Sequence, residues 1–171
     1  MTMKLHIGGK QIKEGWKILN IQKDVGVDFM GDISDLSQFT TDSIDEIYAS
    51  HVFEHVRQKD ILPTLRGILR VLKKQGKFYI SVPDMDVLCG IFLNPLASPQ
   101  HKHHVVRMIF GGQVDEFDFH YFGWNDVLLT DCLIQAGFSK WEKVASFGLF
   151  DDTSDYAPYG SPISLNMIVT K

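Results

Sequence analysis

The chain has 171 residues, 44% of them hydrophobic and 22% charged, which suits one globular domain with a sizeable core. Its net charge of −4 gives no general basic footprint and disfavours a nucleic-acid partner. No apolar run is long enough to span a bilayer, and the N-terminus lacks the apolar stretch of a signal peptide, so we expect a cytoplasmic protein with no membrane partner. Cys89 and Cys132 form no CxxC pair, and their apolar surroundings predict buried free thiols.

The first half of the chain predicts five strands and one helix. Short apolar runs bounded by glycine or polar residues predict strands over residues 3–7, 16–21, 25–33, 44–50 and 77–82. Only about eight residues separate the first two strands, which is too short for a helix that connects parallel neighbours. Apolar residues at helical spacing predict an amphipathic helix over residues 58–72, with Pro63 in its first turn and Gly76 beyond its end.

The second half of the chain has a less regular pattern. We expect a helix over residues 84–93, a loop over 94–104, a short helix over 105–110 and an irregular segment over 111–123. Asn125 is a favourable N-cap for a helix that runs to Ala136 and ends at Gly137.

The last two strands are predicted over residues 141–147 and 164–170, and no helix is expected between them. Strands joined in this way form an antiparallel pair, here at one edge of the sheet. The alternation of strands and helices before them predicts a mainly parallel sheet with helices on both faces. The sequence thus predicts one α/β domain over residues 1–171.

The strand over residues 44–50 ends in a cluster of polar side chains. Ser50, His51, Glu54 and His55 come directly after its apolar residues and lead toward the next helix. Ligands of open α/β sheets bind at the carboxyl ends of the strands. The cluster therefore predicts a functional site at this end of the sheet.

His51, Glu54 and His55 also fit the H-x-x-E-H pattern of one class of zinc hydrolases. That pattern needs a continuous helix and a third ligand downstream, for which Asp131 is the only crude match. Because a strand leads straight into the pattern here, we predict no bound metal. Glu54 then caps the following helix and His55 packs on the sheet, or one of the two serves as a general base.

Two segments of the second half admit more than one interpretation. The histidine-rich residues 101–104 lack a cysteine or paired carboxylate at ligand spacing, which favours a solvated loop or lid over a metal site. Residues 115–119 alternate acidic and aromatic side chains, so they either line a pocket or pack as a flap.

Four parts of the chain together resemble small class I S-adenosylmethionine (SAM)-dependent methyltransferases of the type-11-like branch. They are residues 5–9 with 14–16, residues 27–33, residues 44–55, and residues 69–77 with 82–84. The resemblance implies a Rossmann-like seven-stranded sheet, SAM as the cofactor and methyl transfer to a small-molecule or sugar-type acceptor. It also implies that residues 94–123 form a lid or an acceptor-site insertion, since loops on a rigid scaffold carry specificity.

The resemblance assigns roles to the residues at the strand ends. The implied SAM-binding residues are Gly8, Gly9, Asn20, Asp32, Ile33, Ser50 and His51. Glycine permits close backbone approach, a polar group after the second strand suits the ribose hydroxyls, and one after the third strand suits the adenine amine. His55 and His120 are the expected catalytic residues on the acceptor side. They would act as a general base for an acceptor that must lose a proton, since other acceptors need only to be positioned.

Two positions depart from the family's pattern. Lys10 stands where the glycine-rich turn usually has a third glycine, and Asn20 replaces an acidic ribose acceptor. Each change is expected to weaken SAM binding. The alternative is therefore a non-catalytic domain on the same fold that acts as a binding or partner module. Nothing in the sequence selects among acceptors or oligomeric states.

Overall fold

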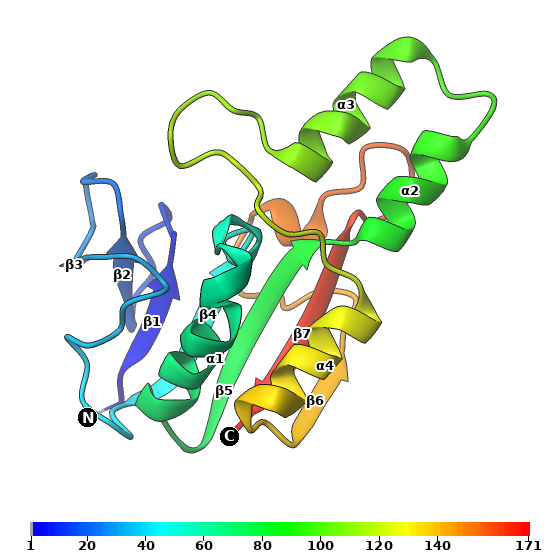
Figure 1. Cartoon of the computed structure of the whole chain (residues 1–171). Helices are drawn as coiled ribbons and strands as arrows, with labels where there is room; N and C mark the ends of the chain where they lie inside the picture. The colour runs from blue at the N-terminus through cyan, green and yellow to red at the C-terminus, as the bar shows by residue number, and fades with distance from the viewer. Residues whose placement is uncertain (1) are drawn as a thin grey trace.

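The computed structural model describes residues 2–171, and its seven strands form one sheet in the order β3-β2-β1-β4-β5-β7-β6 (Figure 1). The strands are β1 (Lys4–Ile7), β2 (Trp16–Asn20), β3 (Phe29–Met30), β4 (Ile44–Ser50), β5 (Leu72–Pro83), β6 (Lys140–Lys143) and β7 (Ser164–Thr170). The strands from β3 to β5 pair in parallel, whereas β7 runs antiparallel to both β5 and β6. The predicted fold class, a mainly parallel sheet with an antiparallel edge pair, is confirmed.

The register of the central strands brings their polar ends together. Ala49 of β4 lies beside Ile7 of β1 on one side and Ile80 of β5 on the other. The residues that follow these positions, Gly8 and Ser50 among them, therefore meet at one edge of the sheet.

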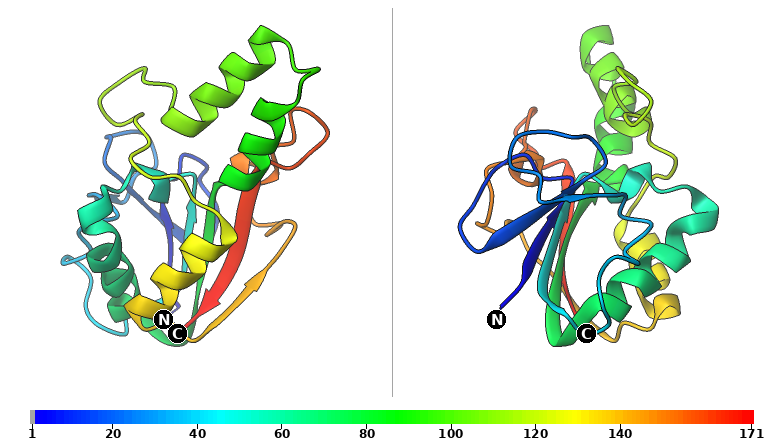
Figure 2. Two further views of the ribbon diagram at one scale, coloured as in Figure 1. Left: turned by 45° about the vertical axis from the view of Figure 1, so that its right-hand side comes forward. Right: turned by 90° about the vertical axis from the view of Figure 1, so that its left-hand side faces the viewer.

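The main core lies between the sheet and two helices, α1 (Ile61–Val71) and α4 (Asp126–Ala136). Both helices cover the same face, as the side view in Figure 2 shows. Leu65 and Ile68 of α1 and Leu133 of α4 are fully buried in this core. Side chains alternate along a strand, so these helices cover every second residue of β1, β4 and β5.

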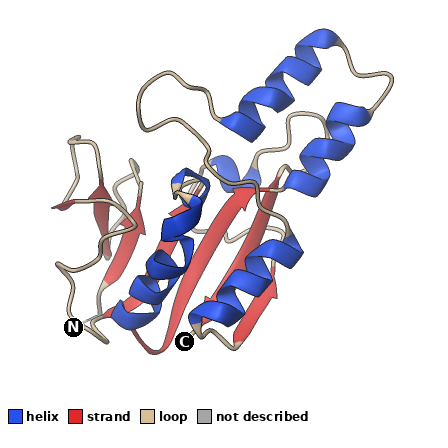
Figure 3. Cartoon of the chain, in the orientation of Figure 1, coloured by secondary structure: helices blue, strands red, loops and turns tan. Residues whose placement is uncertain are grey.

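The opposite face of the sheet is covered mainly by loops (Figure 3). Phe150 packs on His6, Trp16 and Tyr48, and the following segment contains the 3-10 helix η3 (Thr153–Asp155). Among the described residues, the helical cover predicted for this face is reduced to η3. The reason lies in the connections from β1 to β2 and from β2 to β3, which are too short to hold a helix of normal length.

Helices α2 (Met85–Leu93) and α3 (Pro99–Phe110) pack together beyond the carboxyl ends of the strands (Figure 1). The predicted helix over 105–110 is present but is the second half of α3, which already begins at Pro99, so the predicted loop over residues 94–104 is wrong from that residue on. Ser98 caps the helix by accepting a hydrogen bond from the amide of His101, and proline at the first helical position is favourable. The histidine-rich residues 101–104 therefore lie on a helix, where His104 Nδ1 is 2.6 Å from the Tyr159 hydroxyl.

Smaller corrections concern strand lengths and one cysteine. The predicted strand over residues 25–33 is reduced to the two residues of β3, and β5 begins directly after α1 instead of at residue 77. Cys89 is exposed, contrary to the predicted burial, because its helix α2 packs on α3 with few buried residues. Within residues 2–171, no helix combines the length and the apolar character that crossing a bilayer requires.

Candidate active site at the carboxyl ends of the strands

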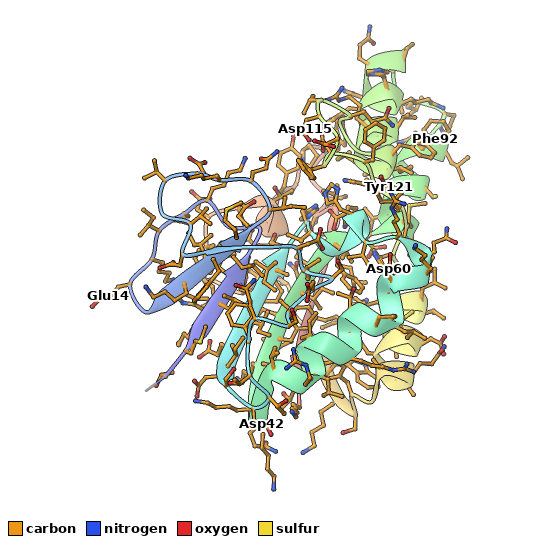
Figure 4. The ribbon with its side chains drawn as sticks, turned by 60° about the vertical axis from the view of Figure 1, so that its left-hand side comes forward. Glu14, Asp42, Asp60, Phe92, Asp115 and Tyr121 are labelled. Carbon is orange, nitrogen blue, oxygen red and sulfur yellow. The ribbon has the colours of Figure 1, made fainter. Side chains whose placement is uncertain are left out.

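A cavity of about 670 Å³ opens at the carboxyl ends of β1, β2 and β4. Residues 111–123, which we call the flap, border it from the side of α3, and Figure 4 shows Asp115 and Tyr121 on this segment. Of the predicted site residues, six line this cavity: Gly8, Asn20, Asp32, Ile33, His51 and His55.

The turn after β1 requires glycine at two successive positions. Gly8 has a φ of +72°, and a Cβ there would lie 2.5 Å from Val52 Cγ2. A Cβ on Gly9 would lie 2.5 Å from the ring of His6, which is itself packed against Phe150. The chain backbone can thus approach the cavity closely at Gly8, and Lys10 lines the cavity after the turn.

Asn20 ties the end of β2 to this turn. Its side chain is buried, and its Nδ2 donates a hydrogen bond to the Gly9 carbonyl oxygen at 3.2 Å. Its Oδ1 accepts a hydrogen bond from the amide of Gln22 at 3.0 Å. Both ends of the Asn20 amide are therefore engaged within the protein, at the position where the resemblance implies a ribose acceptor.

Asp32 and Ile33 follow β3 and take different positions at the cavity. The exposed Asp32 accepts a hydrogen bond from the amide of Ser34 at 2.7 Å, and its side chain lines the cavity. Ile33 is buried and also packs on the main core. The pair therefore offers one carboxylate and one apolar surface to a ligand.

Ser50 and His51 point in different directions at the end of β4. The Ser50 hydroxyl donates to Asp152 Oδ1 at 3.1 Å, on the face of the sheet that η3 covers, and it lies outside the cavity lining. His51, with a φ of +52°, lines the cavity, and its Nε2 lies 2.8 Å from the Ser164 hydroxyl. The structure thus brings His51, but not Ser50, to the cavity.

Glu54 belongs to the 3-10 helix η1 (Phe53–His55) and lies at the centre of a group of three histidines. It is fully buried, with His51 Nδ1 at 3.4 Å and His120 Nε2 at 4.0 Å from its Oε1. The rings of His55 and His120 meet edge to face, with their centroids 4.7 Å apart. The four side chains therefore form one cluster, which includes both predicted catalytic histidines.

The cluster shifts the pKa values of its members. Burial, the largest influence, would raise the pKa of Glu54, but the interaction with His51 and the charges of His55 and His120 outweigh it and lower that pKa. Burial lowers the pKa of His120, against the attraction of Glu54. The cluster thus favours the ionised form of Glu54, whereas burial disfavours the charged form of His120.

The flap brings His120 to this cluster by a sharp reversal of the chain. Gly111 has a φ of +85°, and a Cβ there would lie 2.2 Å from the Asp118 carbonyl oxygen. The amide of Tyr121 then donates to the Glu54 carbonyl oxygen at 2.8 Å. Asp131, the third ligand considered from the sequence, instead lies on α4 and bonds with Gln135 of the same helix.

The comparisons with known proteins agree with this architecture. A family model described as "Methyltransferase domain" matches residues 6–80. A SAM-dependent methyltransferase from Archaeoglobus fulgidus is similar at a TM-score of 0.64 and 15% identity, over 99% of this chain and 86% of that one. The chain has the class I methyltransferase fold. The resemblance seen in the sequence, to the type-11-like branch of these methyltransferases, is thereby confirmed.

Two further solved methyltransferases have the same fold. A possible histamine N-methyltransferase from Thermotoga maritima has a TM-score of 0.61 and 15% identity, over 100% of this chain and 83% of that one. The Burkholderia thailandensis 1,6-didemethyltoxoflavin-N1-methyltransferase has a TM-score of 0.63 and 14% identity, over 99% and 70% of the two chains, and its structure holds S-adenosylhomocysteine. The search of curated proteins gave no match. The predicted cofactor, SAM, agrees with the methyltransferase family and fold.

Proposed function

We propose that the protein transfers a methyl group from SAM, bound in the cavity, to a small-molecule or sugar-type acceptor. The observation that carries the proposal is the position of the cavity, at the carboxyl ends of β1, β2 and β4 in a class I methyltransferase fold. Its volume of about 670 Å³ is typical of small-molecule sites. The proposed cofactor site comprises Gly8, Gly9, Asn20, Asp32, Ile33 and His51.

The charged groups at the cavity suit the two ends of SAM. Lys10 follows the glycine turn and lines the cavity, so its ammonium group is available to the carboxylate of the cofactor. Asp32 lines the cavity beyond β3, where its carboxylate can accept a hydrogen bond from the adenine amine. Ser50, which bonds with Asp152, would act by holding the end of β4 in place.

The acceptor would bind under the flap, next to His55 and His120. Methyl transfer depends mainly on the alignment of the acceptor with the methyl group, and a base is needed only where the acceptor loses a proton. His120 suits that role, because burial lowers its pKa and keeps the ring neutral. The flap, a loop carried by the sheet and its helices, would select the acceptor.

A calorimetric titration with SAM and with S-adenosylhomocysteine tests the cofactor site. We expect micromolar binding by the intact protein and at least tenfold weaker binding by D32A, since a hydrogen bond to a charged group contributes about 1.5–3 kcal/mol. D131A is the matched control, because Asp131 is an exposed carboxylate on α4 that does not line the cavity. Equal weakening by D32A and D131A would refute the proposed position of the adenine.

One observation favours the second function, a non-catalytic binding or partner module. The Asn20 amide is engaged at both ends, with Gly9 and Gln22, and so offers less to a ribose than a free carboxylate would. If neither ligand binds at millimolar concentration, the cofactor proposal fails and the non-catalytic module takes its place.

A further inference from the structure

Glu54 presents an unusual situation for a buried acidic residue. Its side chain is only 1% exposed, and neither carboxylate oxygen has a hydrogen-bond partner among the described residues. A buried carboxylate without partners is costly unless it is paired or coordinates a cation. The contact with His51, at 3.4 Å from Oε1, is an ion-pair distance and leaves Oε2 unpaired.

Two histidines present ring nitrogens next to this carboxylate. The Glu54 oxygen and one ring nitrogen each of His55 and His120 all lie within 4.8 Å of one another. The Nδ1 of His55 is 3.1 Å from the Phe119 carbonyl oxygen, which can only accept, so Nδ1 carries the proton and Nε2 keeps its lone pair. A hydrogen bond of this kind is the usual way in which a metal-binding histidine is oriented.

We propose that Glu54, His55 and His120 bind a divalent transition-metal cation, with His51 supporting Glu54 from the other side. Two imidazoles and one carboxylate suit Zn²⁺, Fe²⁺, Mn²⁺ or Co²⁺ better than Mg²⁺ or Ca²⁺, which prefer oxygen ligands throughout. Ligands at about 2.1 Å from a tetrahedral ion lie about 3.4 Å apart. The three side chains would therefore move together by about 1 Å, which rotation of the partly exposed His55 permits.

The surrounding structure holds this group in place. The flap is fixed to η1 by the hydrogen bond from the Tyr121 amide to the Glu54 carbonyl oxygen. The Nε2 of His51 lies 2.8 Å from the Ser164 hydroxyl, which itself donates to the Thr153 carbonyl oxygen and so accepts from His51. Three protein ligands leave a coordination position open, and His55 borders the cavity, so the ion would lie at the edge of the cavity.

With a metal bound, His120 would act as a ligand in place of the base role proposed for it above, and metal binding tests the site directly. Protein purified without a histidine tag and stripped with a chelator is titrated with Zn²⁺ and with Mn²⁺, and the bound metal is counted by mass spectrometry. We expect one ion per chain and at least tenfold weaker binding by E54Q and by H120A. Titrating the same variants with SAM keeps the two proposals separate, because either site can fail while the other binds.

The chain offers a matched control for the histidine variant. His103 is an exposed residue on α3, so H103A should bind the metal as the unchanged protein does. Binding lost in H103A and kept in H120A would place the ion on α3 and overturn the proposal, as would the absence of stoichiometric binding. Because E54Q keeps the size and shape of the side chain, circular dichroism of its metal-free form shows whether the variant still folds, which separates a lost ligand from a lost fold.

Discussion

Gly8 and Gly9 lie side by side in the turn at the cavity, yet they require glycine for different physical reasons. At Gly9 the obstacle is steric, because a Cβ would lie 2.5 Å from the His6 ring, which Phe150 confines at a centroid distance of 4.1 Å. At Gly8 the backbone itself is the obstacle, with a φ of +72°, in addition to the overlap with Val52. Two double-mutant cycles can separate the two effects.

We expect G9A to lose about 1–3 kcal/mol of unfolding free energy, the usual effect of overpacking. In the H6A background the ring is gone, so adding G9A should change stability by less than about 0.5 kcal/mol. G8A in the V52A background should still lose about 1–2 kcal/mol, because removing the valine does not relieve a left-handed backbone.

Urea unfolding followed by circular dichroism measures all these free energies, provided that the slope with urea is unchanged. The H6A and V52A single variants supply the reference for each cycle. If G9A costs as much without the His6 ring as with it, the steric explanation is wrong. If V52A fully rescues G8A, the backbone explanation is wrong.

Three further predictions concern other parts of the fold. Burial lowers the pKa of His6 to about 4. As the pH falls below 6.5, the His6 ring therefore binds a proton in the unfolded chain but stays neutral in the folded protein. The unfolding free energy should thus fall by about 1.4 kcal/mol between pH 7.5 and 5.5 through this residue, and H6A should lose that share of the slope. S50A should lose about 1 kcal/mol through its bond with Asp152 and keep the affinity for SAM, as urea unfolding and calorimetry would show. S98A should lose about 1 kcal/mol of stability and increase amide exchange at the start of α3, where Ser98 caps His101.

Local signals in the sequence predicted the elements whose ends they mark. The strand over residues 44–50 and the helix between Asn125 and Gly137 have the predicted bounds, because turn residues, an N-cap and a left-handed glycine act within a few residues. The same kind of signal, Ser98 followed by Pro99, marks α3, but the polar histidine tract obscured it. β3 pairs over only two residues, Phe29 and Met30, and the end of its parallel neighbour β2 at Asn20 limits the pairing on the carboxyl side.

The candidate site was predictable in part for the same reason. Gly8, Asn20, Asp32 and His51 follow strands directly, so the strand order brings them together at the cavity. The contact of His120 with Glu54 depends instead on the path of the flap, which no short pattern encodes. The pattern of His51, Glu54 and His55 was visible in the sequence. Only the fold shows that His120 lies next to these residues.

The departures at Lys10 and Asn20 follow from the short connection between β1 and β2. In glycine-rich turns of this kind the third glycine permits a helix to pack closely on the strand. Here β2 follows at Trp16 without such a helix, so the exposed Lys10 has no packing to disturb. The turn is held instead by the hydrogen bond from Asn20 to the Gly9 carbonyl oxygen.

This explanation predicts how restoring the family's residues would act. K10G should not strengthen SAM binding. N20D should lower the unfolding free energy of the protein, because a buried carboxylate would face the Gly9 carbonyl oxygen without a proton to donate. We expect N20D to lose about 1–3 kcal/mol in urea unfolding, while the conservative N20Q serves as the control that keeps the donor. A tenfold gain in SAM affinity in the K10G/N20D double variant would show instead that Lys10 and Asn20 weaken the binding of SAM to this chain.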